Sequence, residues 1–111
     1  MTLEERHLLP ARRLTETRKI TTEDGHTVHL SVGFDPEDLS KPREVFYSGG
    51  FRAGSQLEFL VQDACVLISL LLQHGYEPSQ IAKSLAKREN ALGSVDYASL
   101  IGLVSAELGN L

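Results

Sequence analysis

The sequence predicts an α+β fold in which a three-stranded antiparallel meander is followed by three helices, with a long apolar first helix against the sheet. Three observations predict it. Residues 28–34 alternate between apolar and polar side chains, as in a strand with one packed face. Asp24-Gly25 separates two strand-like runs, as in a tight hairpin. From Ser55 onward the apolar residues recur at the three- and four-residue spacings of a helix.

The composition is that of one ordinary globular domain. The chain has 111 residues, of which 41% are hydrophobic and 23% charged, and its net charge is −4. This charge argues against a general nucleic-acid binder, which requires a strongly basic surface. We expect an N-terminal arm over residues 1–14 and a single domain over residues 15–111. The arm mixes arginines with glutamates, so it is either a solvated tail or a contact for a phosphate-bearing partner.

The strands are assigned in chain order. Residues 15–22 are rich in β-branched side chains and form the first strand, and the turn at residues 23–26 leads into the second. On the second strand, Val28, Leu30, Val32 and Phe34 share one face. Residues 35–42 contain two prolines and are predicted to form a polar loop, after which residues 43–47 are predicted to form the third strand.

The helices follow from apolar spacing and end signals. The first begins at Ser55, and Ser55-Gln56-Leu57-Glu58 fits a capping box in which Glu58 reaches back to the Ser55 amide. Gly75 and Tyr76 fit a Schellman end. Its predicted inner face is Leu57, Leu60, Val61, Ala64, Leu67, Ile68, Leu71 and Leu72.

Val66 and Leu70 lie off that face, so the second half of the first helix is apolar nearly all round. Such a helix is buried on most sides, either centrally in the fold or against another subunit, and we expect a homodimer or higher homo-oligomer.

Two shorter helices are predicted after the first. Pro78 suits the first turn of the second helix, whose predicted inner face is Ile81, Ala82, Leu85 and Ala86. Lys87 and Arg88 are placed near its end, where cations favour the helix dipole. A loop over residues 90–94 then leads to a third helix over about residues 95–108.

Several kinds of chemistry are disfavoured by the residues present. Cys65 is the single cysteine, which excludes an intrachain disulfide and a multi-thiolate metal site and fits a reduced, cytoplasmic setting. It lies in the apolar helix and reads as a packing residue. His26 and His29 would point to opposite faces of a strand, so we expect no metal site. The longest apolar run, residues 64–72, is shorter than the roughly 20 residues of a membrane span.

The glycine-rich turn before the first helix is the one candidate ligand site. Gly50, Arg52, Gly54 and Ser55 lie where free helix amides and an arginine could bind an anion such as phosphate or a nucleotide. A nucleotide-hydrolysing phosphate loop is not expected, because Gly54 occupies the position of the required lysine. The alternative is a structural strand-to-helix turn with a solvated Arg52.

Residues 12–108 resemble the TSCPD domain family, which occurs at the C-terminal end of adenosylcobalamin-dependent (class II) ribonucleotide reductases and as small stand-alone bacterial proteins. The match is carried by Glu44-Val45-Phe46, Gly49-Gly50, Arg52-Ala53-Gly54-Ser55, Asp63-Ala64, Ser69-Leu70 and Leu72-Gln73-His74-Gly75. The Thr-Ser-Cys-Pro-Asp stretch that names the domain is absent, as are its accompanying cysteines. Metal and thiol roles of cysteine-bearing relatives therefore transfer to no residue here.

The resemblance implies an accessory or interaction domain rather than an enzyme in its own right. Ribonucleotide reduction needs three thiols and a much larger fold for its cofactor, and this chain has one cysteine. We therefore expect no catalytic residues and no cofactor, with a reductase or another protein as a partner. The alternative is a small anion- or nucleotide-binding protein that uses the glycine-rich helix start.

Overall fold

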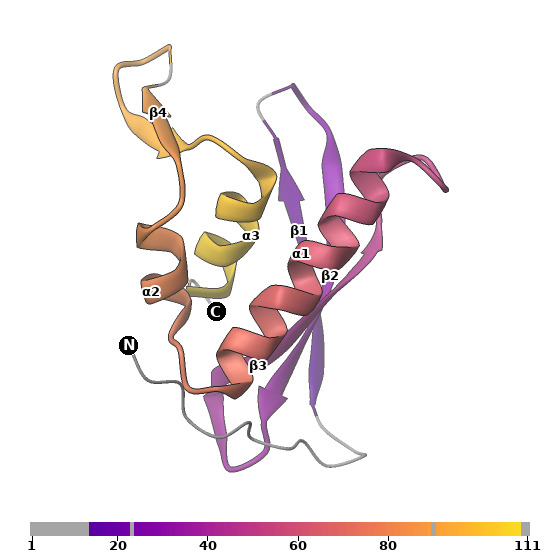
Figure 1. Cartoon of the computed structure of the whole chain (residues 1–111), viewed down its shortest axis with the longest axis vertical. Helices are drawn as coiled ribbons and strands as arrows, with labels where there is room; N and C mark the ends of the chain where they lie inside the picture. The colour runs from indigo at the N-terminus through magenta and orange to yellow at the C-terminus, as the bar shows by residue number, and fades with distance from the viewer. Residues whose placement is uncertain (1–13, 23, 90, 110–111) are drawn as a thin grey trace.

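The computed structural model describes residues 14–22, 24–89 and 91–109. It has the predicted α+β architecture, with a three-stranded antiparallel sheet, helix α1 across one face of it, and helices α2 and α3 beside α1 (Figure 1). The predicted arm lies almost wholly outside the described residues. The elements in chain order are β1 Thr15–Thr21, β2 Thr27–Asp35, β3 Asp38–Gly49, α1 Gln56–Gln73, α2 Pro78–Lys83, β4 Lys87–Glu89, β5 Val95–Tyr97 and α3 Leu100–Gly109.

The sheet confirms the predicted meander. Its order is β1-β2-β3, and both neighbouring pairs are antiparallel. The alternation of β2 sets the packed face, since Val28, Leu30 and Val32 are fully buried. Gly25 adopts a φ of 83° in the turn between β1 and β2, where the Gly25 amide donates to the Thr22 carbonyl at 2.9 Å.

Strand β3 begins earlier than predicted, at Asp38 rather than Arg43, so the expected polar loop is only a tight turn. The carboxylate of Asp35 closes this turn by accepting the Glu37 amide at 2.9 Å. Pro42 is tolerated because β3 is an edge strand, and because Pro42 pairs with Phe34 where the register shifts.

Helix α1 begins and ends as its sequence signals predict. Ser55 is the N-cap, and its side chain accepts the Glu58 amide at 3.2 Å. At the other end Gly75 has a φ of 95°, and its amide donates to Leu72 at 3.1 Å while the Tyr76 amide donates to Leu71 at 3.1 Å. These two bonds are those of the predicted Schellman motif.

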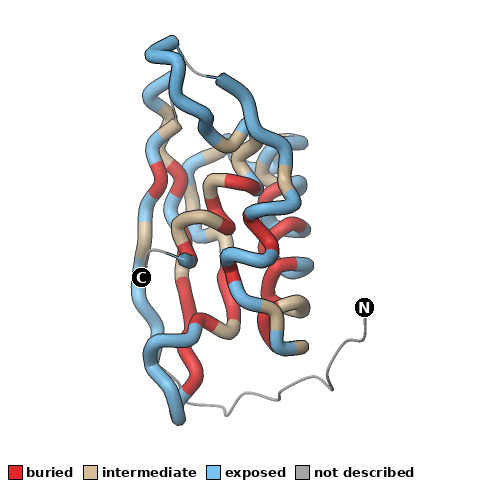
Figure 2. The backbone as a smooth tube through the Cα atoms, turned by 90° about the vertical axis from the view of Figure 1, so that its left-hand side faces the viewer, coloured by how far each residue is buried: buried red, intermediate tan, exposed pale blue. Residues whose placement is uncertain are grey.

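The buried face of α1 is narrower than predicted. It consists of Val61, Ala64, Cys65, Ile68, Ser69, Leu72 and Gln73. Leu57, Leu60 and Leu67, which were predicted to face inward, are 55%, 52% and 62% exposed. The reason is geometric: a single sheet offers one surface to a helix, and α2 and α3 lie to one side of α1 rather than over it (Figures 1 and 2).

Buried polar contacts fix α1 to the edge strand β3. The Ser69 hydroxyl donates to the Cys65 carbonyl at 2.8 Å, lies 3.1 Å from the Val45 carbonyl and accepts the Val45 amide at 2.9 Å. The Gln73 side chain donates to the Arg43 carbonyl at 3.2 Å. These bonds satisfy backbone groups that an edge strand would otherwise leave unpaired.

The C-terminal part departs most from the prediction. Helix α2 begins at Pro78 as expected and buries Ile81 and Ala82, but it ends at Lys83. Lys87 and Arg88 were placed near the end of a helix and instead lie in β4, which pairs with β5 in a two-stranded ribbon.

Helix α3 begins at Leu100 instead of near residue 95. Its start is set by Ser99, whose hydroxyl accepts the Gly102 amide at 3.1 Å. Helices α2 and α3 pack on each other, and Val104 and Leu108 of α3 join the core formed by the sheet and α1.

Candidate functional site

The glycine-rich turn between β3 and α1 is largely satisfied by its own chain. The Ser55 amide donates to the Arg52 carbonyl at 3.0 Å, and the Gly54 amide donates to the Glu58 carboxylate at 3.1 Å. Glu58 thus caps Gly54 rather than Ser55, which corrects the predicted capping box. Because the Glu58 carboxylate also carries negative charge at the helix start, it opposes an incoming anion.

The glycines of this turn have different environments. A Cβ on Gly50 would lie 2.5 Å from the Thr27 carbonyl oxygen and 2.9 Å from the Val28 Cα, and the φ of Gly50 is 131°. Gly50 therefore permits close backbone packing against β2. Gly54 has a φ of 78° and no atom near its missing side chain. Arg52 is exposed. The structure brings Gly50, Arg52, Gly54 and Ser55 together in one turn, and anion binding there stays a prediction.

Three aromatic rings are stacked beside this turn. His26 and Phe51 have ring centroids 4.7 Å apart at an interplanar angle of 15°, and Tyr47 lies on Phe51 at 6.1 Å and 20°. The His26 Nε2 is 2.5 Å from the Gly50 carbonyl, and the Phe51 amide donates to the Tyr47 hydroxyl at 2.7 Å. These bonds hold the stack in one arrangement. The strand alternation predicted no such stack, because His26 precedes β2.

The outer face of α1, defined here as Phe59, Leu60, Asp63, Val66 and Leu67, is exposed. Its four apolar residues are 48–62% exposed. On a helix of about 3.6 residues per turn, Leu60 and Leu67 form one row, Phe59 and Val66 form another, and Asp63 lies between the rows. Contiguous exposed apolar patches are common at protein–protein interaction surfaces.

Within the described residues, α1 is the only helix long and apolar enough to cross a membrane by length and composition. Core helices of soluble proteins pass the same test, and 39% of this helix is buried against the rest of the fold. The packing of α1 along the sheet accounts for its apolar character on that side.

Cys65 is a packing residue, as predicted. It is 2% exposed, and burial raises the pKa of its thiol to about 11. The described residues contain no group of three or more His, Cys, Asp or Glu side chains placed to hold a metal ion.

The Cys65 thiol is expected to resist alkylation by iodoacetamide in the folded protein at pH 8 and to react only when the chain unfolds. The raised pKa also predicts a pH effect on stability. Below about pH 9 the thiol is largely protonated in both the folded and the unfolded chain. Between about pH 9 and 11 it ionises in the unfolded chain but stays protonated in the folded one, so the free energy of unfolding falls as pH rises. Labelling rates across a denaturant series measure the protection of the thiol from alkylation. Rapid labelling without denaturant would contradict it.

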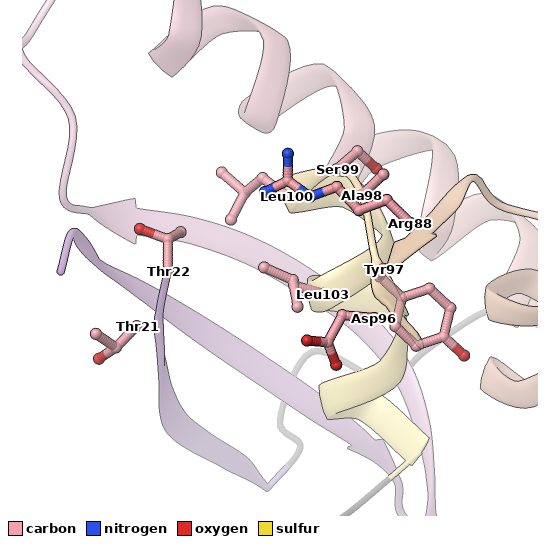
Figure 3. Close-up of a pocket in the computed structure, with 9 residues that line it drawn as sticks. All are labelled: Thr21, Thr22, Arg88, Asp96, Tyr97, Ala98, Ser99, Leu100 and Leu103. Carbon is pink, nitrogen blue, oxygen red and sulfur yellow. The ribbon is translucent and has the colours of Figure 1, made fainter. Parts of the chain in front are cut away.

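Two adjoining hollows lie between the β1–β2 hairpin and the C-terminal part of the chain. The smaller, of about 270 Å³, is shown in Figure 3 and lined by Thr21, Thr22, Arg88, Asp96, Tyr97, Ala98, Ser99, Leu100 and Leu103. The larger, of about 470 Å³, is lined by Thr22, Asp24, His26, Phe51, Leu57, Arg88 and Leu100. Sequence reasoning missed both, because it placed Arg88 and Asp96 on helices and so gave no reason to bring them near β1.

Comparison with known proteins gives a family match. A family model described as the TSCPD domain matches residues 2–106 of the 111-residue chain. Searches of curated proteins and of solved structures found no match. The family match covers nearly the whole chain, including the glycine-rich turn and the Schellman end of α1. The chain therefore belongs to the TSCPD domain family, which is associated with C-terminal regions of ribonucleotide reductases.

Proposed function

We propose that this chain is a non-catalytic interaction domain, related in role to the C-terminal domain of adenosylcobalamin-dependent ribonucleotide reductases, and that it associates through the outer face of α1. The exposure of that face carries the proposal. Phe59, Leu60, Val66 and Leu67 are about half exposed on a helix whose opposite side forms the core. A reduced, cytoplasmic setting agrees with the buried thiol of Cys65.

The chemistry of the chain supports an interaction role over catalysis. The single cysteine is buried and held protonated, so it does not supply a thiolate nucleophile.

We propose that a second copy of the chain binds the outer face of α1. Helix α1 has 18 residues and is about 27 Å long. In an antiparallel pair of these helices related by a two-fold axis, Leu60 of one copy lies against Leu67 of the other, and the two apolar rows cover each other. The Asp63 carboxylates then lie near the axis, where like charges weaken the pair until salt screens them.

The double variant Leu60→Glu/Leu67→Glu is expected to be monomeric where the parent chain is dimeric. Each substitution places a charge in the centre of the interface, and a charge buried there without a partner costs several kcal/mol. Sedimentation velocity over a concentration series measures the change. Raising the salt concentration is expected to preserve or strengthen the parent dimer, because its association is apolar and the Asp63 repulsion is screened.

Leu92→Glu is the matched control, since Leu92 is 91% exposed and lies in the turn of the β4–β5 ribbon, away from α1. It should leave the dimer intact. A parent chain that sediments as a monomer at high micromolar concentration would refute association with a second copy. The same variants, mixed with a purified class II reductase from the same organism, then test whether the face binds that partner instead.

A further inference from the structure

The two hollows described above adjoin, because Thr22, Arg88 and Leu100 line both of them, and together they are called the recess. The recess separates the hairpin end of the sheet from the β4–β5 ribbon and α3. In Figure 3 Thr21 and Thr22 lie on one side, and Arg88, Ser99 and Leu100 lie on the other. The larger hollow, of about 470 Å³, falls within the range of small-molecule sites.

The larger hollow offers a preformed surface for a flat ring. His26 and Phe51 both line it, and their rings are already stacked. The His26 Nε2 is hydrogen bonded to the Gly50 carbonyl, and the Phe51 backbone amide donates to the Tyr47 hydroxyl. Leu57 and Leu100 complete an apolar wall. Because these side chains are fixed before binding, little conformational entropy is lost when a heterocycle packs on them.

The polar groups around the recess define what the ring must carry. Arg88 can donate two hydrogen bonds to an anionic oxygen. The Ser99 hydroxyl accepts the Gly102 amide and retains its own proton for donation. Asp24 lines the larger hollow and can accept from a ligand hydroxyl, as carboxylates do from ribose. The hydroxyl of Thr22 already donates to Asp24, which fixes that carboxylate at the rim.

The charges also limit how negative the ligand can be. Asp96 lines the smaller hollow and pairs in register with Arg88 across the ribbon. With Asp24 in the larger hollow, two carboxylates accompany one arginine, which disfavours a triphosphate. A single phosphate next to Arg88 and Ser99, with hydroxyls toward Asp24 and a base beside His26 and Phe51, uses the arginine, the serine hydroxyl and one of the two carboxylates.

We propose that this recess binds a nucleoside monophosphate, with the phosphate at Arg88 and the base against His26 and Phe51. The site is distinct from the predicted anion site, since neither hollow is lined by Gly50, Arg52, Gly54 or Ser55. It is also separate from Phe59, Leu60, Val66 and Leu67 of the α1 outer face, so ligand binding does not depend on the proposed association.

Calorimetric titration with adenosine and cytidine monophosphates, adenosine and inorganic phosphate tests the assignment. The monophosphates are expected to bind more tightly than adenosine or phosphate alone. Arg88→Gln is expected to weaken monophosphate binding roughly tenfold or more, as for loss of a charged hydrogen bond, and to leave adenosine binding nearly unchanged. Lys41→Gln, at an exposed cation that lines neither hollow, is the matched control and should not change the affinity, whereas Arg52→Gln tests the helix start as the alternative site.

Chemical-shift mapping on the unsubstituted protein provides a readout that does not depend on any variant folding. Addition of the monophosphate should shift the backbone amides of Thr22, Phe51 and Ser99. The proposal is overturned if the parent binds no monophosphate at millimolar concentration, or if inorganic phosphate binds equally well. It is likewise overturned if Arg52→Gln, rather than Arg88→Gln, removes binding, because the ligand would then occupy the helix start.

Discussion

Replacing Arg43 with methionine is expected to lower the free energy of unfolding by about 3–5 kcal/mol, the usual cost of removing one partner from a buried ion pair. The Arg43 Nε lies 3.1 Å from the Asp35 carboxylate, and the two side chains are 15% and 7% exposed. Arg43 also donates through Nη1 to the Leu72 carbonyl at 3.0 Å, near the C-terminal end of α1. Methionine fills much of the space but leaves the Asp35 charge and the Leu72 carbonyl without these donors.

Chemical denaturation measures the loss, and two further variants show its origin. Arg43→Lys keeps the positive charge but cannot bond both acceptors, so its cost should be intermediate. Arg52→Met removes an exposed arginine and should change the unfolding free energy by no more than about 0.5 kcal/mol. Equal stability of Arg43→Met and Arg52→Met would show that the bridge between the β2–β3 turn and α1 does not contribute to stability.

The sheet and α1 could be predicted from the sequence because their signals are long and mutually consistent. Alternation over Val28, Leu30 and Val32 leaves one arrangement in which all three are buried. Ser55 and Gly75 fix the ends of α1 through local hydrogen bonds, which depend on neighbouring residues alone. Neither kind of signal requires knowledge of what packs against the element.

The C-terminal ribbon could not be predicted in the same way. Strands β4 and β5 have three residues each, and five of those six residues are exposed, so no alternation is available to identify them. Lys87 and Arg88 are good helix formers, and only their pairing with β5 places them in a strand. The recess depends on this ribbon, and for that reason it could not be predicted from the sequence.

The width of the buried face of α1 is likewise a tertiary property. Leu60, Leu67 and Ile68 are equally apolar, but Ile68 points to the sheet while the two leucines do not. Helical spacing identifies which residues share a face, and only the arrangement of the sheet, α2 and α3 determines how much of the helix they cover. The apolar residues of α1 therefore exceed what the core buries, and this excess is the observation behind the proposed association.

The second large effect is expected at Gly50, where substitution by alanine should lower the free energy of unfolding by about 2–5 kcal/mol. Part of the cost is the backbone conformation, because a φ of 131° is strained for any residue with a Cβ. The rest is a collision, since the added Cβ would lie 2.5 Å from the Thr27 carbonyl oxygen. The Thr27 oxygen and the nearby Val28 Cα both belong to the backbone, so neither can turn away as a flexible side chain could.

Two neighbouring glycines separate these contributions. Gly54→Ala meets no atom within 4 Å but retains a φ of 78°, so it should show the conformational cost alone, roughly 1 kcal/mol. Gly49→Ala meets no atom within 4 Å and has no positive φ, so its stability should stay close to that of the parent. Denaturation of the three variants should give the order Gly50, Gly54, Gly49, from the largest loss to the smallest. A Gly50→Ala variant as stable as Gly49→Ala would contradict the close approach of this turn to β2. Because the expected order follows from backbone conformation and backbone contacts, it explains Gly50 and Gly54 without a ligand at the helix start.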